Sequence, residues 1–485
     1  MINEKGENMK SHSILSNFIW RFLERIGAQL VQLVVSIILA RLLAPTDYGT
    51  IALMNVFISL LGIFVNCGLS SALIQKKDTD DTDFSTVFYA QMFLCIILYV
   101  VLFISSPAIA KFYNTPEMIW MIRVLGLTLI IAGVKNVQVA YVSRTMQFKR
   151  FFFATLGGTI GAAVVGIGLA YAGFGAWALI GQSLFNNTVD TIILWITVKW
   201  KPKKLFSLQR LKLLFAYSWK LLFSSLLDTV YNNLRTLIIG KVYSSEDLAY
   251  YNRGQSWPNL IIENVNSSID SVLFPSMSAV QNDKESVKMM TRRAIKTSTY
   301  IMAPIMMGLA FCGKTLVKLV LTEKWLFCVP FQAIFCITYM FYPIHTANLN
   351  AIKAMGRSDL FLKLEIIKKI VGLIALGMTV PISVMAMGYS LLVTSVLSQI
   401  INSWPNKKLL NYGYLDQLKD ILPGILLAVA MGICIYPIQF IGFSDIITLI
   451  LQVLLGAIIY ILSSALLKLE SFVYLWEICK SIKKR

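Results

Sequence analysis

Long apolar segments recur along this chain, and they constrain its fold more than any other feature. An apolar run of about 18 or more residues can cross a lipid bilayer as one helix. We count fourteen such segments between residues 16 and 467. The composition agrees, because 57% of the 485 residues are hydrophobic and 14% are charged, whereas soluble domains carry about 25% charged residues. The sequence therefore predicts an all-α, polytopic membrane protein.

The fourteen predicted spans are separated by short loops. In chain order they cover roughly residues 16–43, 49–74, 84–109, 117–140, 151–172, 174–197, 213–240, 247–277, 293–312, 325–352, 360–382, 384–404, 418–438 and 443–467. The longest loops, near 198–212 and 278–292, are both basic. A membrane glycosyltransferase or polysaccharide polymerase generally needs a larger outer loop or domain for its catalytic site. We therefore expect a protein that is not an enzyme, and we keep the polymerase as the enzyme alternative.

The loop charges predict the orientation of the chain. Its net charge of +19 comes mostly from loops between apolar segments, a distribution that argues against nucleic-acid binding. One side of the predicted membrane receives most of the lysines and arginines, including those of 199–212, 284–296 and the 480–485 tail. The loops on the other side hold little beyond Arg41, Lys111, Lys241, Lys314, Lys318 and Lys324. The positive-inside rule then places both termini in the cytoplasm, which requires an even number of spans.

The sequence also contains an internal repeat. Residues 14–56 and 213–257 both read as a helix with embedded cations, a short acidic turn and a second apolar helix. The repeat continues with 146–152 against 356–362 and with 175–179 against 388–392. This pattern predicts an N-lobe of six spans (1–198), a basic cytoplasmic linker (199–212), a C-lobe of six spans (213–405) and two extra spans with a basic tail (406–485). Paired lobes with a site between them are typical of transporters.

The first of these repeated segments align residue by residue. Arg41 falls on Lys241, Asp47 on Asp247 and Gly49 on Ala249.

The cysteines and histidines give no sign of a metal site. Seven cysteines are scattered, mostly in apolar runs, and none forms a CxxC motif, so we interpret them as small core residues. The only histidines are His12 and His345, too few for a histidine metal site. We expect no metal and no cofactor, with proton or sodium coupling as the open question.

Polar residues form stripes inside three predicted spans. Arg21 and Arg25 are four residues apart in the first span, and similar i, i+3 and i+4 spacings join polar residues of the seventh and eighth spans. A charge at the centre of a span costs roughly 2.5–3.5 kcal/mol on insertion scales, so it usually faces a cavity or a charged partner. Such stripes either hold helices together through ion pairs or line a water-filled cavity. Because they recur in equivalent helices of both repeats, we favour the cavity.

The residues of these stripes suggest what the cavity binds. Arginine and lysine suit phosphate oxygens, and amides suit sugar hydroxyls. The candidate substrate-binding residues for a diphosphate and its sugars are Arg21, Arg25, Lys220, Arg235, Arg253 and Asn259. The candidate ion-coupling residues are Asp228, Glu263 and Asp270, because a poorly hydrated carboxylate has a raised pKa.

Three stretches resemble one family of exporters. They are LLAPTDYGTIAL (42–53), MQFKRFF (146–152) and YYNRGQ (250–255). The chain resembles the Wzx-type bacterial polysaccharide flippases, near the colanic acid exporters, within the multidrug/oligosaccharidyl-lipid/polysaccharide superfamily. The resemblance covers nearly the whole chain through the twelfth predicted span. Its motifs mark the family well and the substrate poorly.

The resemblance implies export of undecaprenyl-diphosphate-linked oligosaccharide repeat units across the bacterial cytoplasmic membrane by alternating access. It also implies contact with membrane lipid and, as candidate partners, a polysaccharide polymerase and assembly proteins. Two alternatives within the superfamily stay open. A lipid II flippase is close in chemistry, whereas a cation-coupled drug antiporter is disfavoured because it would suit an acidic cavity.

Overall fold

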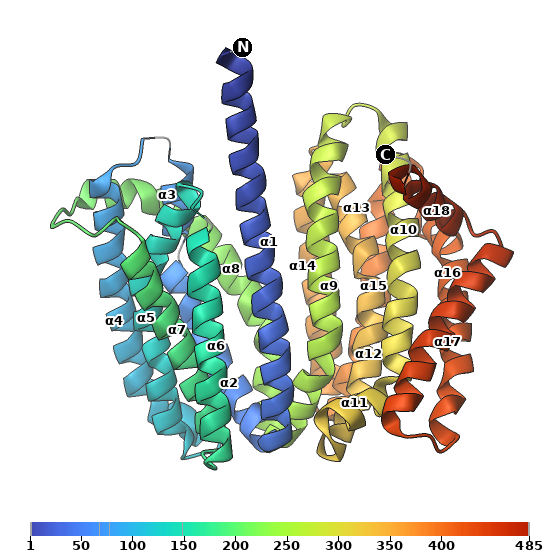
Figure 1. Cartoon of the computed structure of the whole chain (residues 1–485), viewed down its shortest axis with the longest axis horizontal. Coiled ribbons are helices and arrows are strands. Elements are labelled where there is room, and N and C mark those ends of the chain that lie inside the picture. Colours follow the sequence, from blue (N-terminus) through green and yellow to red (C-terminus); the bar gives the residue numbers. More distant parts are fainter. Residues whose placement is uncertain (1, 67, 77, 148, 484–485) are drawn as a thin grey trace. The chain divides into compact units, whose positions relative to one another are not determined.

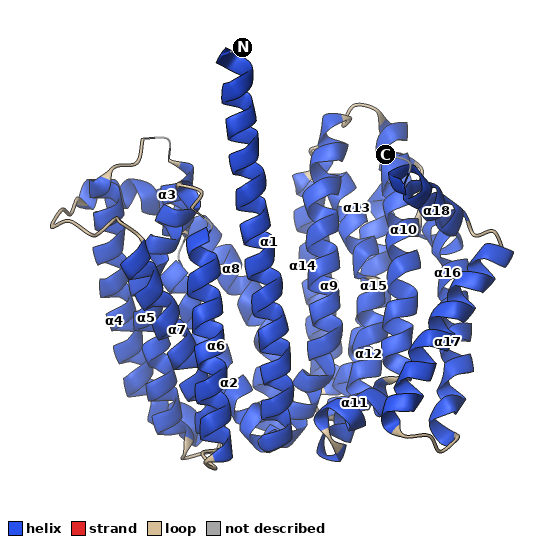
Figure 2. Ribbon diagram, in the orientation of Figure 1, coloured by secondary structure: helices blue, strands red, loops and turns tan. Residues whose placement is uncertain are grey.

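The chain folds into helices joined by short loops. The computed structural model describes residues 2–66, 68–76, 78–147 and 149–483, and this part contains no strand (Figure 2). Figure 1 labels most of the helices in chain order. They are α1 (Ile2–Leu42), α2 (Pro45–Asn66), α3 (Leu69–Gln75), α4 (Asp81–Phe112), α5 (Met118–Arg144), α6 (Lys149–Tyr171), α7 (Ala176–Thr197), α8 (Leu208–Val242), α9 (Ser245–Ala279), α10 (Lys284–Phe311), α11 (Gly313–Leu321), η1 (Glu323–Cys328), α12 (Val329–Met340), α13 (Tyr342–Ala354), α14 (Ser358–Thr379), α15 (Val384–Leu410), α16 (Tyr414–Ile435), η2 (Tyr436–Phe440), α17 (Asp445–Leu466) and α18 (Glu470–Lys483).

The predicted all-α membrane fold is confirmed. Each predicted span lies on one helix or on consecutive short helices. Within the described residues, ten segments are long and apolar enough to cross a membrane. The four remaining long helices that correspond to predicted spans are α7, α8, α9 and α14. Of these four, α8 and α9 carry two of the three polar stripes that the sequence predicts.

Two predicted spans are interrupted. The segment predicted at 49–74 is divided between α2 and α3, and Gly68 precedes α3 with a φ of 69°, a backbone conformation that glycine adopts without strain. The segment predicted at 325–352 is divided into η1, α12 and α13. Pro330 and Pro343 stand in the first turns of α12 and α13, where a missing N–H is tolerated.

The chain divides into two compact units, Met1–Leu248 and Ala249–Arg485. The division lies at the start of α9, so α8 and the linker before it pack within the first unit. The repeat predicts that the linker 199–212 separates an N-lobe from a C-lobe, and this boundary stays a prediction.

In the first unit, α6 packs against α1 and α7, and α5 packs against α4 and α7. Its buried apolar core joins helices that are distant in sequence. The core residues include Leu73, Phe84, Val137 and Trp200. Trp200 belongs to the linker, and its indole N–H donates to Asp81 at 3.0 Å. The linker is thus part of the core of this unit.

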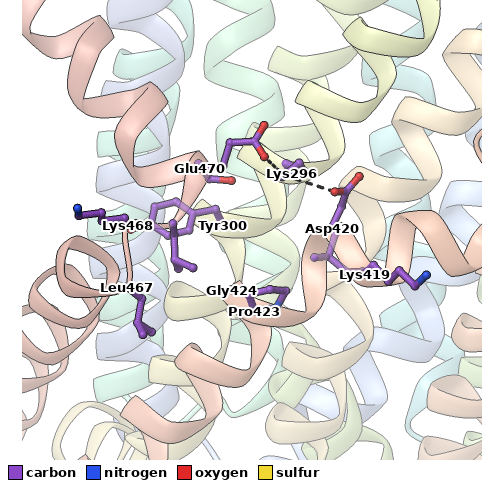
Figure 3. Close-up of a pocket in the computed structure, with 12 residues that line it drawn as sticks. Lys296, Tyr300, Lys419, Asp420, Pro423, Gly424, Leu467, Lys468 and Glu470 are labelled. Atoms are coloured by element: carbon purple, nitrogen blue, oxygen red, sulfur yellow. Dashed lines mark hydrogen bonds and ion pairs between the residues drawn. The ribbon is translucent and has the colours of Figure 1, made fainter.

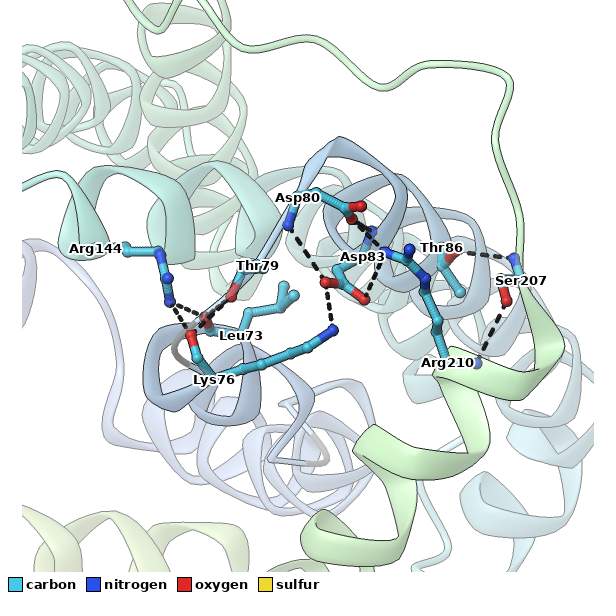
Figure 4. Close-up of polar contacts among 9 residues, drawn as sticks. All are labelled: Leu73, Lys76, Thr79, Asp80, Asp83, Thr86, Arg144, Ser207 and Arg210. Atoms are coloured by element: carbon cyan, nitrogen blue, oxygen red, sulfur yellow. Dashed lines mark hydrogen bonds and ion pairs between the residues drawn. The ribbon is translucent and has the colours of Figure 1, made fainter.

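A group of charged and hydroxyl side chains ties the linker and α8 to α3 and α4, and we call Lys76, Asp80, Asp83, Ser207 and Arg210 the linker clamp (Figure 4). The buried Asp83 accepts from Lys76 Nζ at 2.6 Å and lies 3.4 Å from the Arg210 guanidinium, which also pairs with Asp80. The hydrogen bond from Arg210 lowers the pKa of Asp80 to about 2. The linker clamp therefore holds the amino-terminal end of α8 against the adjoining ends of α3 and α4.

In the second unit, α10 packs against α12, α13 and α16, and α15 packs against α12, α13 and α14. Buried amides join three of these helices. Asn348 Oδ1 accepts from Asn406 at 2.6 Å and from Gln417 at 2.8 Å, and Asn348 also donates to Gln417 Oε1 at 2.8 Å. This network connects α16, the first of the two extra spans, to α13 and α15.

Candidate functional site

The stripe predicted in the first span begins on α1. Arg25 is exposed, whereas its neighbour Glu24 is only 8% exposed. Glu24 faces α6, where it accepts a hydrogen bond from Thr155 Oγ1 at 3.1 Å. The adjacent charges thus have different surroundings, and Arg25 is the one available to a ligand. The side chains of Arg21 and of Lys220 on α8 lie outside the described residues.

The stripe predicted in the seventh span follows α8. Asp228 is exposed and Arg235 is partly buried. The helix is held near its end by close packing, because a Cβ at Gly240 would lie 2.3 Å from Leu53 on α2. Lys241 Nζ lies over the Phe112 ring, 4.2 Å from its centroid. The linker clamp holds the other end, and the exposed polar face lies between them.

The stripe predicted in the eighth span follows α9. Its cation, Arg253, is partly buried and lies over the Trp325 ring, 5.1 Å from the ring centroid. This stacking orients the planar guanidinium, the group that suits phosphate oxygens. Six residues further along the helix, Asn259 Nδ2 donates to Glu263 Oε1 at 2.7 Å. Glu263 and Asp270 are both exposed.

The structure thus brings Arg253, Asn259 and Glu263 onto one helix of the second unit and places Arg25 and Asp228 on exposed faces of the first. Their roles in substrate binding and ion coupling stay predictions. The arrangement suits an anionic ligand where Arg253 is stacked, with Asn259 one to two turns away for hydroxyl groups.

Two further polar pairs, which the sequence did not single out, connect helices inside the units. In the first unit, Lys135 on α5 forms an ion pair with Asp190 on α7, with Nζ and Oδ2 3.0 Å apart. In the second unit, Asn402 Nδ2 on α15 lies 3.1 Å from His345 Nδ1 on α13. Asp190 is the only charged residue of its predicted span and Lys135 is one of few in its own, and that was the available signal.

A charged pocket of about 220 Å³ lies between the middle of α10, the first half of α16 and the end of α17, next to α18 (Figure 3). Lys296 Nζ lies 3.4 Å from Asp420 and also pairs with Glu470. Arg292 donates to both Asp420 oxygens, at 2.7 and 2.9 Å, and Tyr412 donates to the same carboxylate at 2.8 Å. Because Lys296 is already paired with two acids, we interpret this group as a link that fixes α16 and α18 to α10.

Comparison with known proteins identifies the family. Residues 38–330 match the family described as polysaccharide biosynthesis protein. The chain belongs to this family. The chain is also similar to several bacterial proteins of polysaccharide biosynthesis. The predicted resemblance to polysaccharide flippases of the superfamily is confirmed.

Three relatives show the extent of the similarity. The teichuronic acid biosynthesis protein TuaB of Bacillus subtilis (strain 168) is 24% identical, over 88% of this chain and 89% of the relative. The succinoglycan biosynthesis transport protein ExoT of Rhizobium meliloti (strain 1021) is 24% identical, over 66% of this chain and 65% of the relative. The lipopolysaccharide biosynthesis protein WzxC of Escherichia coli (strain K12) is 22% identical, over 71% and 70%.

Solved structures show the same fold. The lipid II flippase MurJ in an inward closed conformation has a TM-score of 0.71 at 16% identity, covering 94% of this chain and 99% of that one. An inward-facing multidrug resistance MATE family transporter has a TM-score of 0.60 at 16% identity, covering 82% and 95%. At these identities the likeness concerns the fold alone, and the family match carries the functional argument.

Proposed function

We propose that this chain flips undecaprenyl-diphosphate-linked oligosaccharide repeat units across the bacterial cytoplasmic membrane, for assembly of a surface polysaccharide. The observation that carries the proposal is its membership of the polysaccharide biosynthesis protein family over residues 38–330. A relative whose name gives its role is a transport protein of succinoglycan biosynthesis. Ten described segments able to cross a membrane provide the setting that such transport requires.

The chemistry of the striped helices supports this substrate. A diphosphate carries charge that arginine forks bind well, and Arg253 lies over the Trp325 ring, 5.1 Å from its centroid. Arg25 offers a second exposed cation. Asn259 and the exposed polar residues of α8 suit sugar hydroxyls. The proposal places both termini in the cytoplasm, on the basis of the loop charges.

The proposed mechanism is alternating access. We expect the polar faces of α1 and α8 in the first unit, and of α9 in the second, to contact water, because exposed charges on long helices are costly where they face hydrocarbon. Coupling to a proton or sodium gradient would supply the driving force. Polymerase and assembly proteins would receive the flipped unit outside the membrane.

The test is complementation of a deletion strain, with the amount of lipid-linked glycan in each leaflet as the measurement. We expect the deletion to accumulate cytoplasm-facing repeat units, and the wild-type gene to remove them. Arg25→Ala and Arg253→Ala should each fail to restore export fully. Lys204→Ala is the matched control, because Lys204 is an exposed cation in the linker rather than on a striped helix. Normal export in the deletion strain, with no related gene to replace it, would refute the proposal.

The lipid II flippase is the second candidate, because its fold matches this chain with a TM-score of 0.71. The same experiment separates the two. Build-up of lipid II rather than of a polysaccharide repeat unit would favour this candidate.

A further inference from the structure

The ion pair between Lys135 and Asp190 lies inside the predicted membrane region of the first unit. Lys135 is nine residues before the end of α5 at Arg144, and Asp190 is seven residues before the end of α7 at Thr197. At 1.5 Å per residue, the two side chains are about 10–13 Å from those helix ends. They retain 20% and 18% of their side-chain exposure. The pair is therefore mostly buried.

The surroundings of the pair contain few other charges. The helices packed against α5 and α7 are α2, α3, α4 and α6, and α1 packs on the far side of α6. Among described side chains, the ionisable groups of these helices are Asp47 and Tyr48 on α2, Asp81, Asp83, Tyr89, Cys95, Tyr99 and Lys111 on α4, Arg150 and Tyr171 on α6, and Glu24, Arg25 and Arg41 on α1, with Arg123, Tyr141 and Arg144 on α5 itself. Glu24 faces α6 through Thr155, and Lys135 is the cation bonded to Asp190.

A glycine lets α6 approach the pair closely. A Cβ at Gly158 would lie 2.9 Å from Asn186 Oδ1 and 3.4 Å from Asp190 Cβ. The position beside the carboxylate is thus without a side chain, and α6 contributes no counter-charge there.

The repeat gives this pair a counterpart in the second unit. The alignment of 146–152 with 356–362 matches Lys135 with His345 and Gly158 with Lys368. The alignment of 175–179 with 388–392 matches Asp190 with Ser403, next to Asn402. Asn402 and His345 are 3.1 Å apart. Corresponding helices are therefore joined by a polar pair in each unit, an ion pair in one and an imidazole with an amide in the other, with Asn402 aligned to Val189, one position before Asp190.

This comparison separates packing from charge. A pair formed by imidazole and amide suffices to connect the equivalent helices of the second unit, so a carboxylate and an ammonium are not needed for that connection. Burying two charges costs several kcal/mol per ion, and uncharged replacements for such pairs are often as stable. The ionised form in the first unit therefore needs a reason other than packing.

We propose that Asp190 is the site of the proton that drives transport, with Lys135 as its charge partner. The inference rests on the proposed flippase function. A proton from one side of the membrane converts the Asp190 carboxylate to the neutral acid, and its release to the other side restores the carboxylate. While Asp190 is protonated, the Lys135 ammonium has no counter-charge. This favours a conformation that exposes the ammonium to water or to the anionic substrate. The earlier candidates Asp228, Glu263 and Asp270 are exposed, whereas Asp190 is mostly buried.

The test uses the purified full chain in proteoliposomes with an undecaprenyl-diphosphate oligosaccharide, and a glycosidase added outside reports the outward-facing fraction. For an exchange of one proton per substrate, a gradient of one pH unit should change the ratio between leaflets about tenfold, toward the acidic side. Asp190→Asn should still equilibrate the substrate between leaflets but show no effect of the gradient. Lys135→Gln combined with Asp190→Asn, which copies the uncharged pair of the second unit, should behave in the same way.

His345→Gln is the matched control, since it changes the equivalent pair without altering the proposed proton site, and it should keep the tenfold response. Thermal unfolding of each variant checks that it is folded. A full response in folded Asp190→Asn would overturn the inference, as would a wild type driven by a sodium gradient and not by a pH gradient. A wild type that moves no substrate under any condition would overturn the proposed function, and this inference with it.

Discussion

Gly49, at the start of α2, allows the closest backbone approach in the first unit that the structure records for a glycine. A Cβ at this position would lie 1.7 Å from the carbonyl oxygen of Ser245 and 2.5 Å from its carbonyl carbon. Ordinary contacts between nonbonded heavy atoms are at about 3.5–4.0 Å. Gly49→Ala therefore requires a backbone shift of about 2 Å, because the obstacle is main chain and cannot rotate away.

The cost follows from that geometry. Overpacking usually costs about 1–3 kcal/mol, and a clash with backbone belongs at the upper end. For a unit of the size of Met1–Leu248 that unfolds cooperatively, about 1 kcal/mol lowers the midpoint of thermal unfolding by roughly 2 °C. We expect Gly49→Ala to lower it by about 6 °C, as measured by tryptophan fluorescence of the purified protein at a fixed heating rate.

Gly62→Ala is the control from the same helix. A Cβ there would meet nothing within 4 Å, and alanine favours a helix over glycine by about 1 kcal/mol. Its midpoint should stay level or rise slightly. A Gly49→Ala protein that unfolds within 1 °C of the wild type would refute the packing argument.

Three further predictions concern the clamp, the amide network and the topology. The lowered pKa of Asp80, about 2, means that its ion pair stabilises the fold above the unfolded pKa near 4 and that this contribution disappears as pH falls through 2. Asp80→Asn should thus cost up to about 1 kcal/mol at pH 7, because the pair is exposed, and thermal unfolding should show the difference from wild type shrinking toward pH 2. Asn348→Ala removes side-chain hydrogen bonds from two buried amides, each of which keeps one longer bond to a backbone carbonyl. The loss should cost about 1–3 kcal/mol in total and lower the unfolding midpoint more than Thr346→Ala does; an equal effect would contradict the network. Cys479 is exposed in α18, so a variant with this cysteine alone should react with an impermeant maleimide from the cytoplasmic side only, and labelling of intact cells from outside would reverse the predicted orientation.

The sequence predicts the fold well because a span is a local property. Apolar runs found every helix that crosses the predicted membrane, and Gly68, Pro330 and Pro343 mark the places where two predicted spans divide into shorter helices. Helical spacing likewise placed the polar faces of α1, α8 and α9.

Contacts between distant residues were harder to predict. Lys135 and Asp190 are 55 residues apart, and each is an isolated charge that helical spacing does not connect. Carrying the repeat alignment through to His345 would have drawn attention to the position. Asp80 and Arg210 are 130 residues apart, and only the acidic run at 78–83 opposite a basic linker hinted that they meet.

The linker clamp also affects how the chain is made. Asp83 is fully buried among residues of the first unit, and Arg210, one of its two cations, follows it by 127 positions. The first seven helices therefore leave the ribosome before the residues that complete their core, such as Trp200, have been synthesised. During synthesis the amino-terminal unit must remain incomplete until α8 has been inserted, so truncation before residue 210 should yield a product that membrane proteases remove.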